Sequence, residues 1–472
     1  MAVGCLVVMI AFCGIALDIG QIYNRKIELQ AVADAAALAA ASQLDGTSDG
    51  IAKARSMARE VVERGDRTLT VRYNREKVAW NDTALSFGSS PSPGAEWSSP
   101  ASGNVAGLLY ARVRTDQLGA GYGRVQTLFM HVLAPRLSES ALSATAIAKK
   151  SSIRVTPLAI CAMSELENEP RDNPASGTGA ANVELVQYGF RRGVAYDLMQ
   201  LNPGGTLPEH FAVDPETQPG SAGSATNTRA DVIAPYICSG TMAVGGLGGG
   251  NLSVFRAFPL AEVFSAFNSR FGNYGGGMCH VNGAPPDVNV KQYLHTDIGW
   301  MTTVPAGQAA LRYADDGKLR TVADPLTPPA SAIAAAYGPL WTYARAVPYE
   351  SYAAGRFEAS GDYTPFAIEA WPALYGPNAP VAKSYPSGTS TPYAASSGPN
   401  FLAPPLDFRP GMRDRRVLNI PLLECPVSGT SARVVGVGRF FMTVPATPTA
   451  LVAEFAGLAS QSALAGSVEL QQ

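Results

Sequence analysis

Apolar and polar positions divide this chain into three parts, and the first part has the clearest pattern. An almost uninterrupted apolar run, Ala2–Leu17, leads into a mixed segment, Asp18–Gln30, and then into an alanine-rich segment, Ala31–Leu44. Proline is absent from all three segments, and most of their residues are good helix formers. The pattern predicts one long helix over residues 1–44, about 65 Å in length if it is continuous.

The apolar run has nearly the length of a membrane anchor. A helix needs about 20 mostly apolar residues to cross a bilayer, and Ile19 and Ile22 extend the run past Asp18. A signal-peptide core is the alternative, but no basic residues precede the run and the helical pattern continues beyond it. We therefore expect a transmembrane helix, with these residues in the membrane: Ala2, Leu6, Val7, Val8, Ile10, Phe12, Ile15 and Leu17.

The charges next to this run conflict with the cysteines about its orientation. Arg25 and Lys26 follow the run, and the positive-inside rule would place the rest of the chain in the cytoplasm. The dispersed cysteines favour an oxidising compartment instead. We give the cysteines more weight and expect a periplasmic body, with basic residues upstream of Met1 in the natural chain.

Residues 45–150 predict a small α+β module. Asp45-Gly46 ends the long helix, and Ser48 or Asp49 can cap a second, amphipathic helix over 48–64. Alternating apolar and polar positions then predict strands. The remaining elements are expected at Thr68–Tyr73, Val78–Trp80, Leu85–Gly88, Leu108–Thr115 and Ala141–Lys149 for strands, and at Val125–Leu133 for a short helix.

Residues 151–472 predict a mainly β domain. Turn-forming residues are frequent in the chain, with 47 Gly and 35 Pro, and after residue 150 they are spread throughout. Pro259–Arg270 is the one convincing helix, and Tyr375–Pro405 is a long Pro/Ser/Thr/Tyr loop. Strands are expected at Ile153–Ala162, Val232–Cys238, Arg416–Cys425 and Arg433–Val444.

Four cysteines of this last part are candidates for two disulfides. Cys161 and Cys425 each end a buried-type strand, PLAIC and PLLEC, so we expect them to bridge neighbouring strands. Cys238 and Cys279 would then close a loop around the Gly-rich stretch 245–250. Four cysteines allow three pairings, and four unrelated buried thiols are the alternative.

Charge and motifs argue against several functions. The chain has 36 basic and 38 acidic residues, and such a balance does not favour a nucleic-acid partner. The stretch 245–250 lacks the Lys of a P-loop, and Gly46–Gly50 fits G-x-S-x-G but follows a helix rather than a strand. Cys279, His280, His295 and Asp297 form the one local cluster of ligand-type residues. We expect loop polar residues beside a disulfide there, no metal or other cofactor, and no enzyme activity.

The mixed and alanine-rich segments carry a family resemblance. The string Ala16–Leu44 resembles the N-terminal signature of TadG-like Flp (tight-adherence) pilus-assembly proteins of the TadE/TadG family. In that signature an apolar anchor precedes an Asp-Gly-Tyr region, and a basic residue, Leu-Gln and an Ala-Asp-Ala-Ala-Ala-Leu-Ala-Ala string follow. The resemblance covers less than a tenth of the chain, and the Asp-x-Ser-x-Ser metal motif of longer members is absent. The matching positions that we single out are Asp18, Gly20, Tyr23, Leu29, Gln30, Asp34, Ala36 and Ala40.

The resemblance implies a non-enzymatic pilus-assembly component in the bacterial inner membrane, crossing it once, with pilin-like partners and a link to cell adhesion. Small side chains let helices approach closely, so we expect the alanine-rich surface at Ala36 and Ala40 to dock a partner helix. A membrane-anchored envelope enzyme or carbohydrate-binding protein is the alternative, using the loops His280–Asp297 and Tyr375–Pro405.

Overall fold

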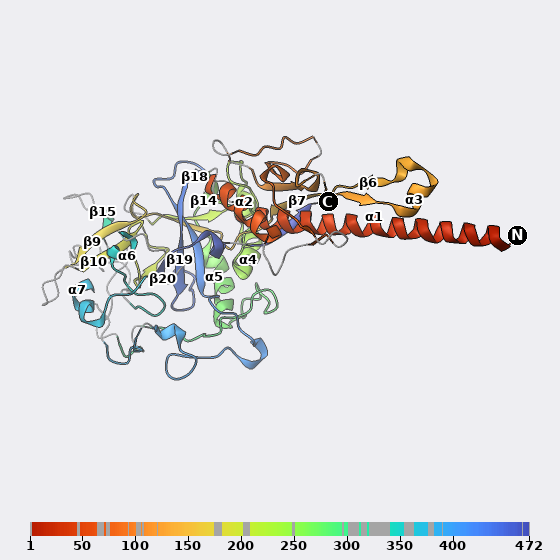
Figure 1. Ribbon diagram of the computed structural model, residues 1–472. Coiled ribbons are helices and arrows are strands. Elements are labelled where there is room, and N and C mark those ends of the chain that lie inside the picture. Colours follow the sequence, from red (N-terminus) through yellow and green to blue (C-terminus); the bar gives the residue numbers. More distant parts are fainter. Residues whose placement is uncertain are drawn as a thin grey trace.

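The computed structural model joins a long N-terminal helix to two β-rich modules (Figure 1). It describes residues 2–44, 48–63, 70–71, 76–92, 94–100, 105, 108–119, 121–173, 182–201, 208–247, 251–294, 297–300, 311–312, 319–320, 340–353, 363–375, 382–388, 390–464 and 466–471.

The N-terminal segment forms the predicted long helix. Helix α1 spans Ala2–Gln43 without a break and extends well beyond the rest of the molecule at its N-terminal end (Figure 1). A second helix, α2 (Ser48–Glu63), begins at the predicted Ser48 and packs on α1. The buried residues of α2 include Ile51, Ala54 and Ala58, whose spacing gives the helix one apolar face.

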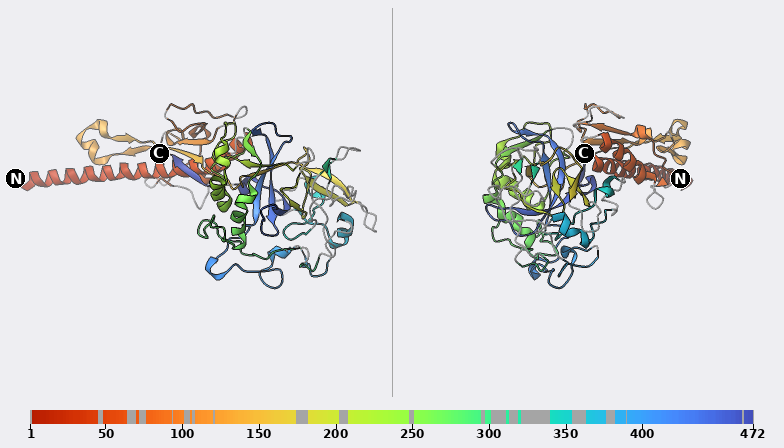
Figure 2. Two further views of the ribbon diagram at one scale, coloured as in Figure 1. Left: turned by 180° about the vertical axis from the view of Figure 1, so that it is seen from behind. Right: turned by 90° about the vertical axis from the view of Figure 1, so that its left-hand side faces the viewer.

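The first module places α1 and α2 against a four-stranded antiparallel sheet. The strand order is β21 (Val468–Gln471), β7 (Thr145–Lys150), β4 (Tyr110–Arg114) and β3 (Leu85–Gly88). The C-terminal strand β21 thus returns to a module built otherwise from residues before 151, and the C-terminus lies beside that module in both views of Figure 2. This pairing ties the C-terminal strand to the first module.

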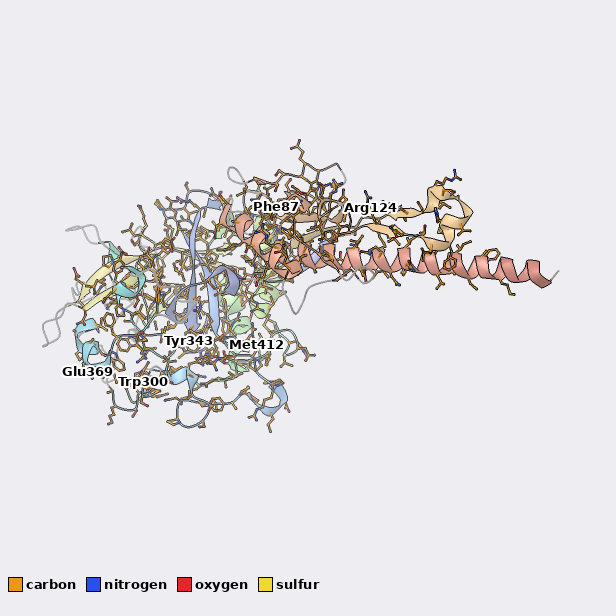
Figure 3. The ribbon with its side chains drawn as sticks, in the orientation of Figure 1. Phe87, Arg124, Trp300, Tyr343, Glu369 and Met412 are labelled. Atoms are coloured by element: carbon orange, nitrogen blue, oxygen red, sulfur yellow. A yellow bond between two sulfur atoms is a disulfide. The ribbon has the colours of Figure 1, made fainter. Side chains whose placement is uncertain are left out.

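A two-stranded ribbon leaves this module and runs beside α1. It comprises β5 (Arg124–Gln126), helix α3 (Leu128–Leu133), the 3-10 turn Pro135–Leu137 and β6 (Glu139–Ala141). We call residues 121–143 the arm. Figure 3 shows Arg124 on the arm, beside α1 and away from Phe87 in the first module. The predicted helix over Val125–Leu133 is therefore too long, because its first residues pair as a strand.

The second module is built on an eight-stranded sheet. All neighbouring strands are antiparallel except β8 and β17, which run parallel. Both faces of the sheet are buried, because Leu158 and Ile160 of β8 face one apolar cluster and Ala159 faces another. The strand order is β12 (Ala195–Asp197), β20 (Val452–Leu458), β19 (Val434–Met442), β17 (Val417–Leu423), β8 (Leu158–Cys161), β13 (His210–Val213), β14 (Leu252–Arg256) and β18 (Ser431–Ala432).

Two helices of the second module contribute to the larger cluster. Helix α5 (Leu260–Asn268) confirms the predicted helix, whereas α4 (Ala230–Ser239) replaces the predicted strand Val232–Cys238. The buried residues Ile233 and Ile237 are four apart, which is helical spacing, and a short apolar run does not distinguish the two structures. The remaining elements are β1 (Thr70–Val71), β2 (Glu76–Lys77), β9 (Glu169–Asn173), β10 (Asn182–Gln187), β11 (Phe190–Arg191), β15 (Leu311–Arg312), β16 (Leu319–Arg320), α6 (Tyr349–Ala353), α7 (Trp371–Tyr375) and α8 (Gln461–Leu464).

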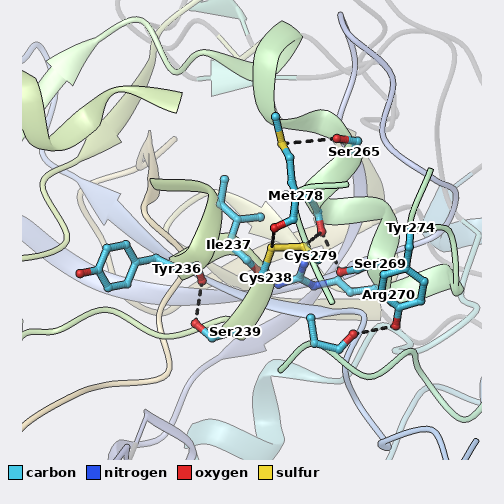
Figure 4. The surroundings of a disulfide bond; sticks show 12 residues. Tyr236, Ile237, Cys238, Ser239, Ser265, Ser269, Arg270, Tyr274, Met278 and Cys279 are labelled. Carbon is cyan, nitrogen blue, oxygen red and sulfur yellow. Dashed lines mark hydrogen bonds between the residues drawn. A yellow bond between two sulfur atoms is a disulfide. The ribbon is translucent and has the colours of Figure 1, made fainter. Parts of the chain in front are cut away.

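Both disulfides are present with the predicted pairing. Cys161–Cys425 joins the end of β8 to the residues just after β17. Cys238–Cys279 joins α4 to the loop after α5 (Figure 4). Beside it, Arg270 donates a 2.8 Å hydrogen bond to the carbonyl of Ile237, one of the last carbonyls of α4. Burial, and secondarily the charge of Arg415, lower the pKa of this arginine.

Candidate functional site

Helix α1 has a buried face that continues along most of its length. The residues on this face are spaced by three, four or seven positions, in places as adjacent pairs, so they lie along one side of the helix. Half of the eight singled-out motif positions belong to it, namely Asp18, Leu29, Ala36 and Ala40, so part of the motif packs within this chain. The buried residues are Gly14, Asp18, Arg25, Leu29, Val32, Ala33, Ala36, Ala37, Ala40 and Ala41.

The alanine-rich half of this face packs inside the first module. Ala36 and Ala40 are fully buried in an apolar cluster that includes Ile51 of α2, Ala111 of β4 and Ala148 of β7. Small side chains allow α1 to lie close to α2 and to the sheet. The surface that we expected to dock a partner helix is therefore covered by the chain itself in this structure, and this corrects the interpretation of Ala36 and Ala40.

The N-terminal half of the buried face holds the arm through Asp18. The Asp18 carboxylate accepts hydrogen bonds from the backbone N–H groups of Leu128 (3.2 Å), Phe129 (2.8 Å) and Met130 (2.7 Å). These groups begin helix α3 and have no partner within that helix. Asp18 is 1% exposed, so the arm covers it almost completely. The motif aspartate thus caps a helix that follows it by more than a hundred residues.

One helical turn before Asp18, Gly14 makes room for the arm. A Cβ atom at Gly14 would lie 2.3 Å from ring atoms of Phe129, far inside van der Waals contact. The absent side chain lets the ring lie directly on the helix backbone. Gly14 and Asp18 are four residues apart and together position α3.

The base of the arm is held further along α1. The guanidinium of Arg25 donates a 3.1 Å hydrogen bond to the carbonyl of Tyr122, and Lys26 donates to the carbonyl of Ser143. Gln30 donates to Asp34 at 2.7 Å and to the carbonyl of Thr145 at 3.3 Å. Polar motif residues of α1 therefore bind the backbone of the arm and of β7.

The opposite face of α1 is apolar and exposed. Ile19, Tyr23 and Ile27 are 54%, 65% and 48% exposed, and their spacing of four residues places them along one side of the helix. Gly20 lies among them, and a Cβ atom there would meet nothing within 4 Å. We call Ile19, Gly20, Tyr23 and Ile27 the open face. Two of its members, Gly20 and Tyr23, are predicted motif residues.

The predicted anchor residues lie at the free end of α1. Phe12 and Leu17 are exposed and Ile15 is partly exposed, while the side chains of Ala2, Leu6, Val7, Val8 and Ile10 fall outside the described ones. Within the part of the chain that the structure describes, no helix has the length and apolar character needed to cross a membrane. The structure therefore does not support the predicted transmembrane helix.

The alternative site around His280 is not assembled in the described residues. Cys279 is committed to a disulfide, and the exposed His280 accepts a hydrogen bond from the N–H of Asn282 through Nδ1. His295 lies outside the described residues. Cys161, Glu209 and Cys425 approach one another closely, but the two sulfurs are bonded to each other and are not thiolate ligands.

A cavity of about 270 Å³ lies where the two modules meet. Its lining includes Lys150 of the first module and Tyr188, Gly436 and Leu464 of the second. Ligand pockets usually enclose about 300–1,000 Å³, so the volume of this cavity lies just below the usual range. The motif residues gather on the two faces of α1 instead, and these two faces are the candidate functional site.

The comparison with known proteins points to the same helix. Residues 1–43 match the family model of putative Flp pilus-assembly TadE/G-like proteins, and these residues are α1 almost completely. The match confirms the resemblance that the motif residues Asp18 to Ala40 indicate. Neither a curated protein nor a solved structure matches the chain.

Sequence reasoning missed the arm as a part of this site. No role was predicted for Gly14 or Phe129, and Arg25 was interpreted only as the basic residue of the motif and as a charge beside the apolar run. The helical spacing of Gly14, Asp18 and Arg25 contained a signal, because it places a glycine and two ionisable side chains on one side of the helix. The position of their partner, more than a hundred residues away, could not be inferred from that spacing.

Proposed function

We propose that this chain is a non-enzymatic component of Tad/Flp pilus assembly in the bacterial envelope, and that the open face of α1 binds a helix of a pilin-like partner. The observation that carries the proposal is the match of residues 1–43 to the TadE/G-like family model. The remainder of the chain serves as a scaffold that holds α1 in a fixed position and presents its open face.

The geometry of the open face supports helix binding. Three large apolar side chains on one side of an exposed helix leave a surface that is unfavourable in water and suited to a helical partner. Gly20 between them allows close approach of a second backbone. The docking surface is thus on the side of α1 opposite to the alanine-rich face.

We further propose that the free end of α1 is held in the inner membrane and that the two modules lie in the periplasm. The apolar run Ala2–Leu17 and the exposed Phe12 and Leu17 favour an apolar surrounding. Two disulfides within the second module favour an oxidising compartment, because thiols stay reduced in the cytoplasm.

The test is in-cell cross-linking from the open face. A photoreactive amino acid at Tyr23 should cross-link to a small pilin-like protein, and Tyr23→Glu with Ile27→Glu should abolish that product and reduce pilus formation. The two substitutions place charges on an exposed surface, so the thermal unfolding of the purified chain should not change.

Leu406→Glu is the matched control, since Leu406 is also an exposed apolar residue but lies in the second module. This variant should form pili normally. Normal pili in the Tyr23/Ile27 variant, or cross-links that never include a pilus-assembly protein, would refute the proposed role of the open face.

A further inference from the structure

The arm reaches from the first module toward the free end of α1. We call Leu128–Leu137 the tip of the arm. Lys26 binds the base of the arm and Asp18 binds the tip, and these two residues are eight positions apart on α1. Eight residues of α-helix correspond to about 12 Å. The tip of the arm therefore lies beside the apolar run Ala2–Leu17, at the level of Gly14 and Asp18.

The tip of the arm exposes large apolar side chains. Leu128 is 68% exposed and Val132 is 81% exposed, and Phe129 and Leu137 are exposed to a smaller extent. Such a cluster on a projecting element marks an interaction surface. Phe12 and Leu17, which lie within three residues of Gly14 on α1, are exposed as well.

The backbone of the tip is well satisfied within the protein. Asp18 accepts from the first three N–H groups of α3, and the N–H of Thr127 donates to the carbonyl of Ser138 at 3.0 Å. The N–H groups of Ala134 and Leu137 are also bonded within the tip. This pairing matters most in an apolar medium, where an unpaired backbone group costs several kcal/mol. It also keeps the Asp18 carboxylate away from that medium.

The ionisable side chains of the arm are mainly basic. Residues 121–143 contain Arg124, His131 and Arg136 but a single carboxylate, Glu139, which pairs with Arg124. Basic side chains around an apolar tip suit the boundary between lipid acyl chains and anionic headgroups.

We propose that the tip of the arm, Leu128–Leu137, inserts shallowly into the lipid surface that holds the free end of α1. The occupant of this apolar patch is lipid, because Phe129 of the tip packs on Gly14 within the apolar run of α1, so the patch lies at the same level along the helix as that run. The arm and α1 then contact the membrane at two places. Two contacts fix the tilt and rotation of the chain relative to the membrane, whereas a single helix leaves its rotation free. The inference rests on the membrane position proposed above for α1.

The test measures the depth of single fluorescent labels in vesicles. The full-length chain with Cys5→Ser and Cys13→Ser, which keeps both disulfides, receives one new cysteine at Val132→Cys, Ala141→Cys, Phe12→Cys or Leu406→Cys. Each variant carries an environment-sensitive label and is reconstituted into vesicles of phosphatidylethanolamine and phosphatidylglycerol that contain nitroxide-labelled lipids.

We expect lipid quenching of the Val132 label to exceed that of the Ala141 label severalfold, because Ala141 is an exposed residue at the base of the same arm. The Val132 label should also emit at shorter wavelength than the Leu406 label. Replacing Leu128 by Glu in the Val132→Cys chain should reduce the quenching.

Each contrary result has a separate meaning. Quenching at Phe12 without quenching at Val132 would overturn the inference and leave the membrane position of α1 intact. Quenching at neither residue would contradict that position and the inference with it. A third result is a Val132 label that is protected from aqueous iodide but is not quenched by the labelled lipids. If this protection rises with the amount of protein per vesicle, the patch contacts a second copy of the chain, and the lipid proposal is overturned.

Discussion

Asp18 in α1 and Phe129 in α3 are 111 positions apart in the chain, and the N–H of Phe129 donates a 2.8 Å hydrogen bond to the Asp18 carboxylate. The contact gives a physical role to an aspartate that the family motif places just after an apolar run. The N–H groups at the start of α3 have no acceptor within that helix, and the Asp18 carboxylate supplies one. The carboxylate in turn receives protein hydrogen bonds in place of hydrogen bonds from water. The arm is therefore fixed by the same segment that matches the pilus-assembly family.

Replacing Asp18 by Ala should release the tip of the arm from α1. Loss of a capping side chain typically costs about 0.5–2 kcal/mol, and here three N–H groups lose their acceptor. Hydrogen exchange at Leu128–Met130 should become faster, while the amides of β17 and β19 keep their protection. Asp18→Asn retains one carbonyl oxygen and should give an intermediate effect. Unchanged exchange in Asp18→Ala would mean that the cap does not hold the arm.

Substitutions at the two glycines of α1 should have opposite effects. Gly14→Leu places side-chain atoms where the Phe129 ring lies, so the arm must move away. Gly20→Ala adds a methyl group in open space and should stabilise the helix by up to about 1 kcal/mol through propensity alone. Limited proteolysis of the arm and thermal unfolding distinguish these effects. Phe129→Ala should partly restore proteolytic resistance to Gly14→Leu, and a lack of rescue would argue against the contact.

Added bulk on the buried alanine face should destabilise the first module. Ala36→Leu introduces three heavy atoms into a position with no exposed surface, and overpacking of this kind typically costs about 1–3 kcal/mol. Ala31→Leu is the matched control, because Ala31 lies on the exposed side of the same helix. Chemical denaturation should show a lower free energy of unfolding for Ala36→Leu only. Equal stability of both variants would mean that the face is not packed as described.

Local patterns predicted much of this fold, and contacts between distant segments account for most of the rest. The unbroken run to Gln43, the start of α2 at Ser48 and the strand pair PLAIC and PLLEC all follow from periodicity and residue type. Helix α4 was misjudged because an apolar run as short as Val232–Cys238 suits either structure. The final strand β21 and the cap at Asp18 each depend on a partner more than a hundred residues away, which a pattern along the chain does not contain.

The two disulfides should contribute unequally to stability. Cys161–Cys425 closes a sequence separation of 264 residues and Cys238–Cys279 one of 41. In the chain-entropy description the longer loop is worth about 1.6 kcal/mol more. Replacing each pair by two alanines and measuring denaturant unfolding should therefore show the larger loss for Cys161 and Cys425. The opposite order would mean that local packing around α4, rather than loop closure, dominates.

The stability of the second module should depend on pH through His210. Its Nδ1 accepts a 3.1 Å hydrogen bond from the N–H of Phe258, and burial lowers the pKa of the imidazole. A base with a lowered pKa in the folded state binds a proton more readily after unfolding. Protonation therefore stabilises the unfolded state relative to the folded state as the pH falls. The contribution of the neutral, buried His210 to the free energy of unfolding is complete above the usual histidine pKa of about 6.5 and is lost as the pH falls below it.

His210→Asn can supply an oxygen acceptor in place of Nδ1 and does not titrate in this range. The free energy of unfolding, measured from about pH 7.5 to about pH 5.5 across the usual histidine pKa, should therefore fall more steeply for the native chain than for this variant. Subtracting the two curves removes the buried carboxyls Asp197, Asp287 and Glu454, whose pKa values desolvation raises and whose effect on stability has the opposite sign. Parallel curves would show that His210 is not protonated on unfolding and that its burial has no part in the pH response.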